Sequence, residues 1–242
     1  MRLVESMIKL ITFDLDNTLW DVGPVLRRAD NELKRWMNES HPEVLMHYKP
    51  DTFAFVKNKI SSEHPHKLNL PTFVRMQFLL HCYSLIGLKG VNLERHARNA
   101  FDVFHHARNQ IDFYPETIPM LNELSKSFAL IALSNGNADV TKVGLGNYFV
   151  AQYSADSTGK PKPHPAMFKE ALDFVGVAAT ESIHVGDHQV EDVKAAQALG
   201  FRTVWLNDKR ASRSCSPDAE VSDLKRMLGS IRQLAALHRV RV

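Results

Sequence analysis

Two aspartates separated by one residue follow the first apolar segment of the chain. Residues 7–13 are mostly apolar, which is typical of a strand buried on both faces of a parallel sheet, and they lead into Asp14-Leu15-Asp16-Asn17-Thr18. Two nearby carboxylates can hold different protonation states, so one can attack as a nucleophile while the other transfers protons. The same pattern also arises by chance, as a polar strand end or a turn.

Two further polar clusters contain a hydroxyl group and a lysine. Ser134-Asn135-Gly136-Asn137 follows the apolar run 128–133. Ser134 can cap a turn or helix, or it can hold a phosphate oxygen together with exposed backbone N–H groups. Lys162 lies between two prolines and is either a solvated loop residue or a fixed positive charge for a phosphate. Lys160 competes for that role because Lys160-Pro161 is locally similar.

A pair of aspartates follows another short segment expected to be a strand, residues 182–185. Gly186-Asp187 ends this segment, and Asp192 lies near the start of an expected helix, where an acid is favourable in any case. The functional alternative is that Asp187 binds a hard cation while Asp192 orients the groups around it. The carboxyl ends of parallel strands meet at one edge of a sheet, so we expect all these polar clusters to converge there.

The elements that must position these residues alternate between strands and helices. We expect strands over 7–13, 128–133, 182–185 and 203–206 and a strand start at 148–150, with helices over 116–125, 138–143, 165–174, 190–199 and 221–237. This alternation predicts an α/β fold with a doubly wound, Rossmann-like parallel sheet. The prediction places the α/β core domain in residues 1–20 and 111–242.

One long stretch interrupts the alternation and is predicted to be helical throughout. Between residues 24 and 108 apolar side chains recur at spacings of three and four, which predicts about four amphipathic helices. The expected apolar stripes are Leu26, Ala29, Leu33 and Trp36, then Phe73, Met76, Leu80 and Tyr83, then Leu93, Ala97, Ala100 and Phe104. Residues 21–110 are therefore predicted to form an inserted helical cap domain.

The composition of the 242 residues, 44% hydrophobic and 24% charged, is ordinary for a soluble globular protein. A net charge of +3, without a dense basic patch, argues against a nucleic-acid partner. No run approaches the length of a membrane span and no signal peptide is recognisable, which predicts no membrane association and a cytoplasmic location. Cys82 and Cys215 lie too far apart in the sequence to suggest a cysteine metal site or a disulfide framework.

Taken together, the polar clusters resemble the motifs of the haloacid dehalogenase-like hydrolase superfamily over nearly the whole chain. The matching segments are Asp14-Leu15-Asp16-Asn17-Thr18, Ser134 in Ser134-Asn135-Gly136-Asn137, Lys162-Pro163-His164-Pro165-Ala166-Met167-Phe168, and Gly186-Asp187-His188-Gln189-Val190-Glu191-Asp192. The third motif favours Lys162 over Lys160. The helical insertion between the first two motifs looks like the type 1 cap of this superfamily.

The resemblance implies a role for each matching residue. Asp14 would attack phosphorus to form an aspartyl-phosphate, and Asp16 would protonate the leaving alcohol and later deprotonate the hydrolytic water. Mg²⁺ would be bound by the Asp14 carboxylate, the Asp16 backbone carbonyl and Asp187, with Asp192 orienting the surrounding groups. The residues expected to bind the phosphoryl group are Thr18, Ser134, Asn135 and Lys162.

Two features refine what the resemblance implies. Dehalogenases of the superfamily lack an acid at the position of Asp16, because their leaving group needs no proton, so this residue favours phosphatase chemistry. The fourth motif departs from the usual pattern at Glu191, where relatives often carry asparagine, and at His188. Glu191 adds negative charge near the expected cation.

The substrate is predicted to be a small phosphorylated metabolite. Segments 11–20, 135–138 and 144–149 look like those of bacterial riboflavin-pathway phosphatases, which act on 5-amino-6-(5-phosphoribitylamino)uracil and on FMN. The alternatives are a phosphatase of phosphoglycolate or a nucleoside monophosphate, a phosphomutase, and a non-catalytic binding protein. Arg27 is a candidate for reading the substrate, although a solvated helix face is the simpler explanation for this residue. We expect a monomer or a small homo-oligomer.

Overall fold

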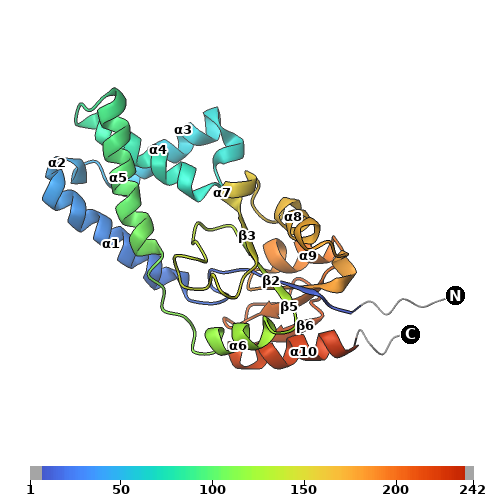
Figure 1. The fold of residues 1–242 in the computed structure, drawn as a ribbon. Coiled ribbons are helices and arrows are strands. Elements are labelled where there is room, and N and C mark those ends of the chain that lie inside the picture. Colours follow the sequence, from blue (N-terminus) through green and yellow to red (C-terminus); the bar gives the residue numbers. More distant parts are fainter. Residues whose placement is uncertain (1–6, 238–242) are drawn as a thin grey trace. The chain divides into compact units, whose positions relative to one another are not determined.

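The computed structural model describes residues 7–237, and the chain divides into two compact units. The core unit comprises the chain up to Asp21 and from Asp112 onward, and the helical unit comprises Val22–Ile111. Figure 1 shows the elements of each unit. Within residues 7–237, none of the helices combines the length and the apolar character needed to cross a membrane.

The core unit is built on a six-stranded parallel sheet with strand order β3-β2-β1-β4-β5-β6. The strands are β1 Leu10–Phe13, β2 Ala129–Ser134, β3 Ala151–Ser154, β4 Ser182–Gly186, β5 Arg202–Leu206 and β6 Ala219–Val221. Every residue of β1 and β4 is buried, as expected for central strands covered on both faces. The predicted α/β fold with a doubly wound parallel sheet is confirmed.

Helices cover the sheet on both faces (Figure 1). They are α6 Thr117–Leu124, α7 Ala155–Thr158, α8 Ala166–Val175, α9 Ala195–Gln197 and α10 Met227–Leu237, with short turns at Ala179–Glu181, Gln189–Lys194 and Leu224–Arg226. α8 and α9 share one apolar cluster with β1 and β2, whereas α6 and α10 pack against each other. This sandwich leaves the carboxyl ends of β1, β2 and β4 to carry polar side chains.

The chain segments that leave and re-enter the core unit are held together. Trp20 forms an antiparallel bridge with Phe113, and their rings meet edge to face at 5.8 Å. The backbone N–H of Tyr114 donates to the Leu19 carbonyl at 3.1 Å, and the Thr117 hydroxyl donates to the same carbonyl at 2.8 Å. These contacts join the outgoing and returning segments within the core unit itself.

The helix predicted over 138–143 is wrong, because this segment forms a series of turns. Gln152 on β3 supplies the reason: its Oε1 accepts from the Val140 N–H at 2.9 Å and its Nε2 donates to the Ala138 carbonyl at 2.6 Å. A side chain from β3 thus binds the Ala138 carbonyl, which a helix over 138–143 would pair internally, and also the Val140 N–H. The strand start expected at 148–150 also moves, since β3 begins at Ala151.

Two predicted helices in the C-terminal part of the core unit differ from the structure. The helix expected over 221–237 begins only at Met227, because Ala219–Val221 instead pairs with β5 as the edge strand β6. The helix expected over 190–199 is present, but its first part is the wider π-helical turn Gln189–Lys194. The first difference reflects a tertiary contact, the pairing with β5, that overrides local helical patterning.

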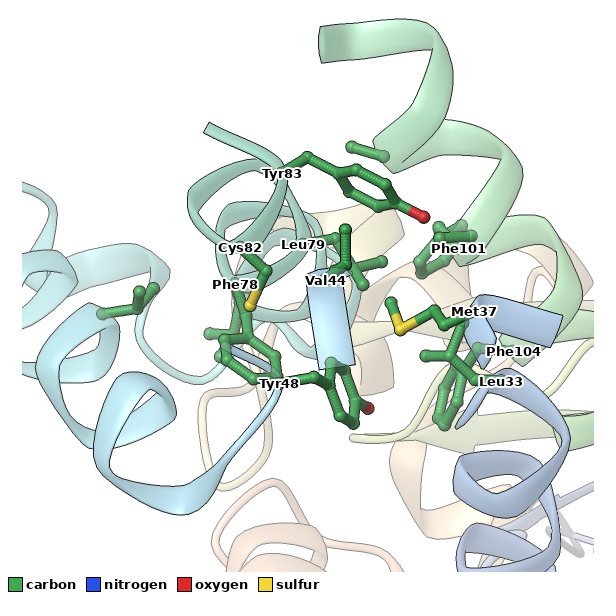
Figure 2. Packing of buried hydrophobic residues seen from close by; sticks show 14 of the residues in the cluster. Leu33, Met37, Val44, Tyr48, Phe78, Leu79, Cys82, Tyr83, Phe101 and Phe104 are labelled. Atoms are coloured by element: carbon green, nitrogen blue, oxygen red, sulfur yellow. The ribbon is translucent and has the colours of Figure 1, made fainter. Parts of the chain in front are cut away.

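The helical unit contains α1 Val22–Ser40, α2 Pro42–Leu45, α3 Pro50–Glu63, α4 Pro71–Leu85 and α5 Gly90–Arg108, with a 3-10 turn at Pro65–Lys67. Proline occupies the first position of α2, α3 and α4, where its missing N–H would have no helical partner. Figure 2 shows the apolar cluster that these helices enclose. It includes Leu33, Met37, Val44, Tyr48, Phe78, Leu79, Cys82, Tyr83, Phe101 and Phe104.

The buried face of α1 is shifted from the predicted stripe. Ala29 and Leu33 are buried as expected, but Val25 and Met37 complete the face, while Leu26 is 40% exposed. Spacing alone allows either stripe, because Val25 and Leu26 are both apolar and adjacent. On α5 the predicted residues Ala97, Ala100 and Phe104 are buried, whereas Leu93 is only half-buried.

Candidate active site

Lys162 lies between two carboxylates at the carboxyl edge of the core sheet. Its Nζ is 2.8 Å from Asp14 Oδ1 and 2.6 Å from Asp192 Oδ1, and the lysine is almost completely buried. Burial disfavours the charged ammonium, but the two carboxylates outweigh it and raise the pKa of Lys162 above its ordinary value. Lys160, the competing candidate, is exposed.

Asp14 follows directly after β1, and the fold holds both its backbone and its carboxylate. Its N–H donates to the Val185 carbonyl of β4 at 2.9 Å. Oδ1 accepts from Lys162, while Oδ2 accepts from the Thr18 hydroxyl at 3.1 Å. The loop between them is tight enough to place Asn17 at a φ of 61°, a left-handed conformation that asparagine tolerates well.

Asp16 is partly exposed and is oriented by an aromatic residue. The indole Nε1–H of Trp20 donates to Asp16 Oδ1 at 2.8 Å. Trp20 itself is fully buried, which fixes the donor in space. Asp16 therefore lies close in sequence to Asp14 but in a wetter environment, as different roles for the two carboxylates would require.

Three carboxylates come together around this lysine. Asp14, Asp187 and Asp192 each offer an oxygen within 4.8 Å of the others. Burial, followed by the neighbouring Asp192, raises the pKa of Asp187 to about 6. Burial also raises the pKa of Asp14 well above its usual value, opposed by Lys162 and reinforced by Asp192 and Asp187. One ammonium does not balance three carboxylates, so the cluster favours a cation.

Asp192 is fully engaged by protein donors. Oδ1 accepts from Lys162 Nζ and lies 3.1 Å from His184 Nε2, and Oδ2 accepts from the His188 backbone N–H at 2.9 Å. Burial alone would favour the neutral acid, but Lys162 and His184 hold the pKa of Asp192 well below its ordinary value. This arrangement suits a carboxylate that positions other groups, whereas Asp14 and Asp187 are better placed to bind a cation.

The sequence reasoning missed His184, a fully buried histidine in the middle of β4. Its Nδ1 lies 2.8 Å from the Thr12 hydroxyl on β1, and its Nε2 faces Asp192. Burial lowers the pKa of His184, so the neutral ring donates from Nε2 to Asp192 and accepts at Nδ1 from Thr12. The available signal was a titratable residue inside a strand expected to be buried on both faces.

The second motif contacts the backbone of Lys162. Ser134, the buried last residue of β2, accepts at Oγ from the Gly136 N–H at 3.0 Å. The Asn135 side chain binds the Lys162 main chain and also contacts Glu191. The structure therefore brings together Asp14, Asp16, Thr18, Ser134, Asn135, Lys162, Asp187 and Asp192 in the core unit. Arg27 is an exposed residue of α1 in the helical unit.

The comparisons with known proteins agree with this geometry. The family model described as haloacid dehalogenase-like hydrolase matches residues 8–200. The chain is 30% identical over 199 residues to the 5-amino-6-(5-phospho-D-ribitylamino)uracil phosphatase of Escherichia coli, covering 82% of this chain and 83% of that protein. It is 33% identical over 137 residues to a phosphoserine phosphatase of Thermus thermophilus, covering 53% of this chain and 55% of that one.

A solved structure is similar over almost the full length of the chain. The crystal structure of a 2-haloacid dehalogenase from Pseudomonas syringae shares 35% sequence identity, with a TM-score of 0.88, and covers 94% of this chain and 100% of that one. The family model spans most of the core unit and all four motifs described above. The chain therefore belongs to the haloacid dehalogenase-like hydrolase family.

Proposed function

We propose that the protein is a magnesium-dependent phosphatase that hydrolyses a small phosphorylated metabolite through an aspartyl-phosphate. The observation that carries this proposal is the placement of Lys162 against Asp14, with the Asp187 carboxylate beside them. A buried carboxylate next to a fixed ammonium suits attack on a phosphoryl group, whose oxygens the ammonium then neutralises. The phosphatases among the relatives support the same chemistry.

In the proposed reaction an Asp14 carboxylate oxygen bonds to phosphorus while the bond from phosphorus to the leaving oxygen breaks. Asp16 gives its proton to the departing alcohol. A water molecule then attacks the aspartyl-phosphate, Asp16 takes the proton from that water, and the bond between phosphorus and Asp14 breaks to release phosphate. Lys162, Ser134 and Thr18 hold the phosphoryl group and the nucleophile in line, which lowers the barrier chiefly by orientation and charge stabilisation.

The residues present fit a divalent cation. Asp14 and Asp187 offer carboxylate oxygens, the ligands that Mg²⁺ prefers, and the neighbouring carboxylates that help burial to raise their pKa values support added positive charge there. The Asp16 backbone carbonyl is the further proposed ligand. When bound, Mg²⁺ would offset the negative charge of the phosphoryl group.

For the substrate we propose FMN or 5-amino-6-(5-phosphoribitylamino)uracil. The support is the likeness to the Escherichia coli phosphatase named for that ribityl compound, which extends over most of both chains. The Thermus thermophilus relative is named for phosphoserine, so the family motifs do not determine the leaving group. Arg27 stays a candidate for reading the substrate, and an unchanged substrate profile after Arg27→Ala would remove it.

Dehalogenation is a second candidate because of the named Pseudomonas syringae structure. Departure of a halide requires no proton, so the partly exposed Asp16, oriented by Trp20, would have no task in that reaction. This residue therefore favours the phosphatase. A halide-release assay with 2-haloacids tests the alternative directly.

The deciding experiment measures phosphate release from FMN, the ribityl phosphate, phosphoserine, phosphoglycolate and nucleoside monophosphates, with Mg²⁺ and with chelator. We expect magnesium-dependent release with preference for FMN or the ribityl compound, and loss of turnover in folded Asp14→Asn. Release from other substrates alone would reject the proposed substrate. Undiminished turnover by Asp14→Asn would reject the mechanism, and halide release without phosphate release would reject the phosphatase.

A further inference from the structure

Glu191 and Asp192 are consecutive residues that hold opposite ends of the same lysine. Asp192 Oδ1 accepts a hydrogen bond from Lys162 Nζ at 2.6 Å. Glu191 Oε2 accepts from Asn135 Nδ2 at 2.9 Å, and Asn135 in turn binds the main chain of Lys162. One turn of the π-helical segment Gln189–Lys194 therefore reaches both the side chain and, through one intermediary, the backbone of Lys162.

The Asn135 amide is fully used by these contacts. Its Oδ1 accepts from the Lys162 N–H at 2.7 Å, and its Nδ2 donates to the Lys162 carbonyl at 2.9 Å. Nδ2 carries two hydrogens, and the second one donates to Glu191, so no donor is left for a ligand. The flipped amide would set Oδ1 against two acceptors, so Glu191 and the Lys162 carbonyl together fix its orientation.

We propose that Glu191 is a positioning residue for Lys162 and acts through Asn135. Lys162 lies in a turn outside helices and strands, so side chains must hold its polar backbone groups. By accepting from the second Nδ2 hydrogen, Glu191 holds the Asn135 amide in the orientation that bonds both backbone groups of Lys162. The residue that departs from the usual fourth motif thus has a task of its own. This inference rests on the proposed function, in which Lys162 binds the transferring phosphoryl group.

The first test is a double-mutant cycle on phosphate release, using Glu191→Ala, Asn135→Ala and the two together. We expect Glu191→Ala to lower kcat/KM about tenfold, as for one hydrogen bond to a charged group. In the Asn135→Ala background the same substitution should have almost no further effect, because Glu191 has lost its intermediary. Glu191→Gln should keep most of the activity, since its amide oxygen still accepts from Asn135.

Glu220→Ala is the matched control. Glu220 Oε1 accepts from Asn207 Nδ2 at 2.8 Å, which is the same kind of contact, made on β6 and involving neither Asn135 nor Lys162. We expect this variant to have wild-type kcat/KM. Wild-type kinetics in Glu191→Ala would overturn the proposal. Multiplicative losses in the double variant, or an equal loss in Glu191→Gln, would also overturn it, because Glu191 would then act independently of Asn135 or through its charge alone.

Hydrogen exchange at the Lys162 amide provides a readout that needs no turnover. This N–H is bonded to Asn135, so we expect about tenfold faster exchange in Glu191→Ala and no change in Glu220→Ala. Unchanged exchange in Glu191→Ala would reject the positioning of Lys162 by Glu191, even if the protein is an active phosphatase. An inactive wild type with the expected exchange would instead reject the proposed function and support the positioning of Lys162 by Glu191.

Discussion

A Cβ atom added to Gly186 would lie 2.3 Å from Cγ of Asp192, so this carboxylate packs directly against the backbone at the end of β4. Side chains do not approach one another so closely, and only glycine leaves room for Asp192 to reach Lys162. We expect Gly186→Ala to displace Asp192, to lower kcat at least about tenfold, and to destabilise the fold by about 1–3 kcal/mol.

The control for this substitution is Gly229→Ala in α10, where an added Cβ meets nothing within 4 Å. That variant should keep its activity and gain slightly in stability, because alanine has less conformational freedom in the unfolded chain. Steady-state kinetics and urea unfolding measure both effects. Wild-type kcat in Gly186→Ala would show that Asp192 need not occupy its present position.

The buried His184 is expected to hold Asp192 through Oδ1, the same oxygen that accepts from Lys162. His184→Leu removes the Nε2–H donor, so we expect kcat to fall about tenfold, whereas His184→Gln should recover part of the loss because its amide can donate to Asp192. Thermal unfolding separates this effect from misfolding. Equal kcat values for two folded variants, Leu and Gln, would contradict the positioning role.

The raised pKa of Asp187 predicts a pH dependence in the metal-free protein. The pKa of this group is about 6 in the folded state and about 3.8 in the unfolded chain, so between these values the folded protein binds more protons there. Its contribution to the free energy of unfolding should therefore fall as pH rises from about 4 to about 6. Compared with wild type, metal-free Asp187→Asn should lack this part of the slope.

If Asp187 binds Mg²⁺ as proposed, the cation would compete with the proton on this carboxylate, so the rise in Tm on adding Mg²⁺ should be larger at pH 7.5 than at pH 5. Differential scanning calorimetry with and without Mg²⁺ at both pH values tests this. An equal rise in Tm at the two pH values would argue against Asp187 as a ligand.

The contribution of Asp16 to kcat is expected to depend on the leaving group of the substrate. Alkyl phosphates release a poor leaving group that needs a proton, whereas a nitrophenyl phosphate does not. We expect Asp16→Asn to lower kcat for alkyl phosphates about 10²-fold or more, with a much smaller loss for the aryl ester. Trp20→Phe, which removes the indole donor to Asp16, should show a weaker form of the same pattern. Equal losses for both ester classes would exclude proton transfer by Asp16.

The corrected apolar face of α1 predicts different costs for two leucines on one helix. Leu33 is fully buried in the cluster of the helical unit, so Leu33→Ala should cost about 2–5 kcal/mol of stability. Leu26 is 40% exposed, and Leu26→Ala should change stability by only about 0.5 kcal/mol. Chemical denaturation of the full chain measures both. Equal costs would support the stripe inferred from sequence.

Much of the α/β core could be predicted because its strands end where the polar residues begin. β1, β2 and β4 are short and buried, β1 and β2 are mostly apolar, and each strand leads directly into residues that meet around Lys162. A parallel sheet brings such ends to one edge, so four motifs distant in sequence predicted a single cluster. The assignment of individual roles to those residues stays a prediction.

The parts that the sequence could not reveal depend on contacts between distant residues. Gln152 turns a helical pattern at 138–143 into turns by taking two backbone groups, and nothing local announces this. β6 is a short edge strand containing Glu220, so its pairing with β5 is invisible in the hydrophobic pattern. The partners of His184 lie on β1 and in the π-helical turn, far apart along the chain.

The bridge between Trp20 and Phe113 pairs the two chain segments at the point where the chain leaves and re-enters the core unit. With Trp20 and Phe113 paired, lengthening the segment between them costs little stability, because loop-closure entropy grows only slowly with length. The segment between Trp20 and Phe113 can therefore change in sequence and length during evolution at little cost to the stability of the core unit. A family with such a bridge is well suited to acquiring new substrates by recombination of the inserted segment as well as by point mutation.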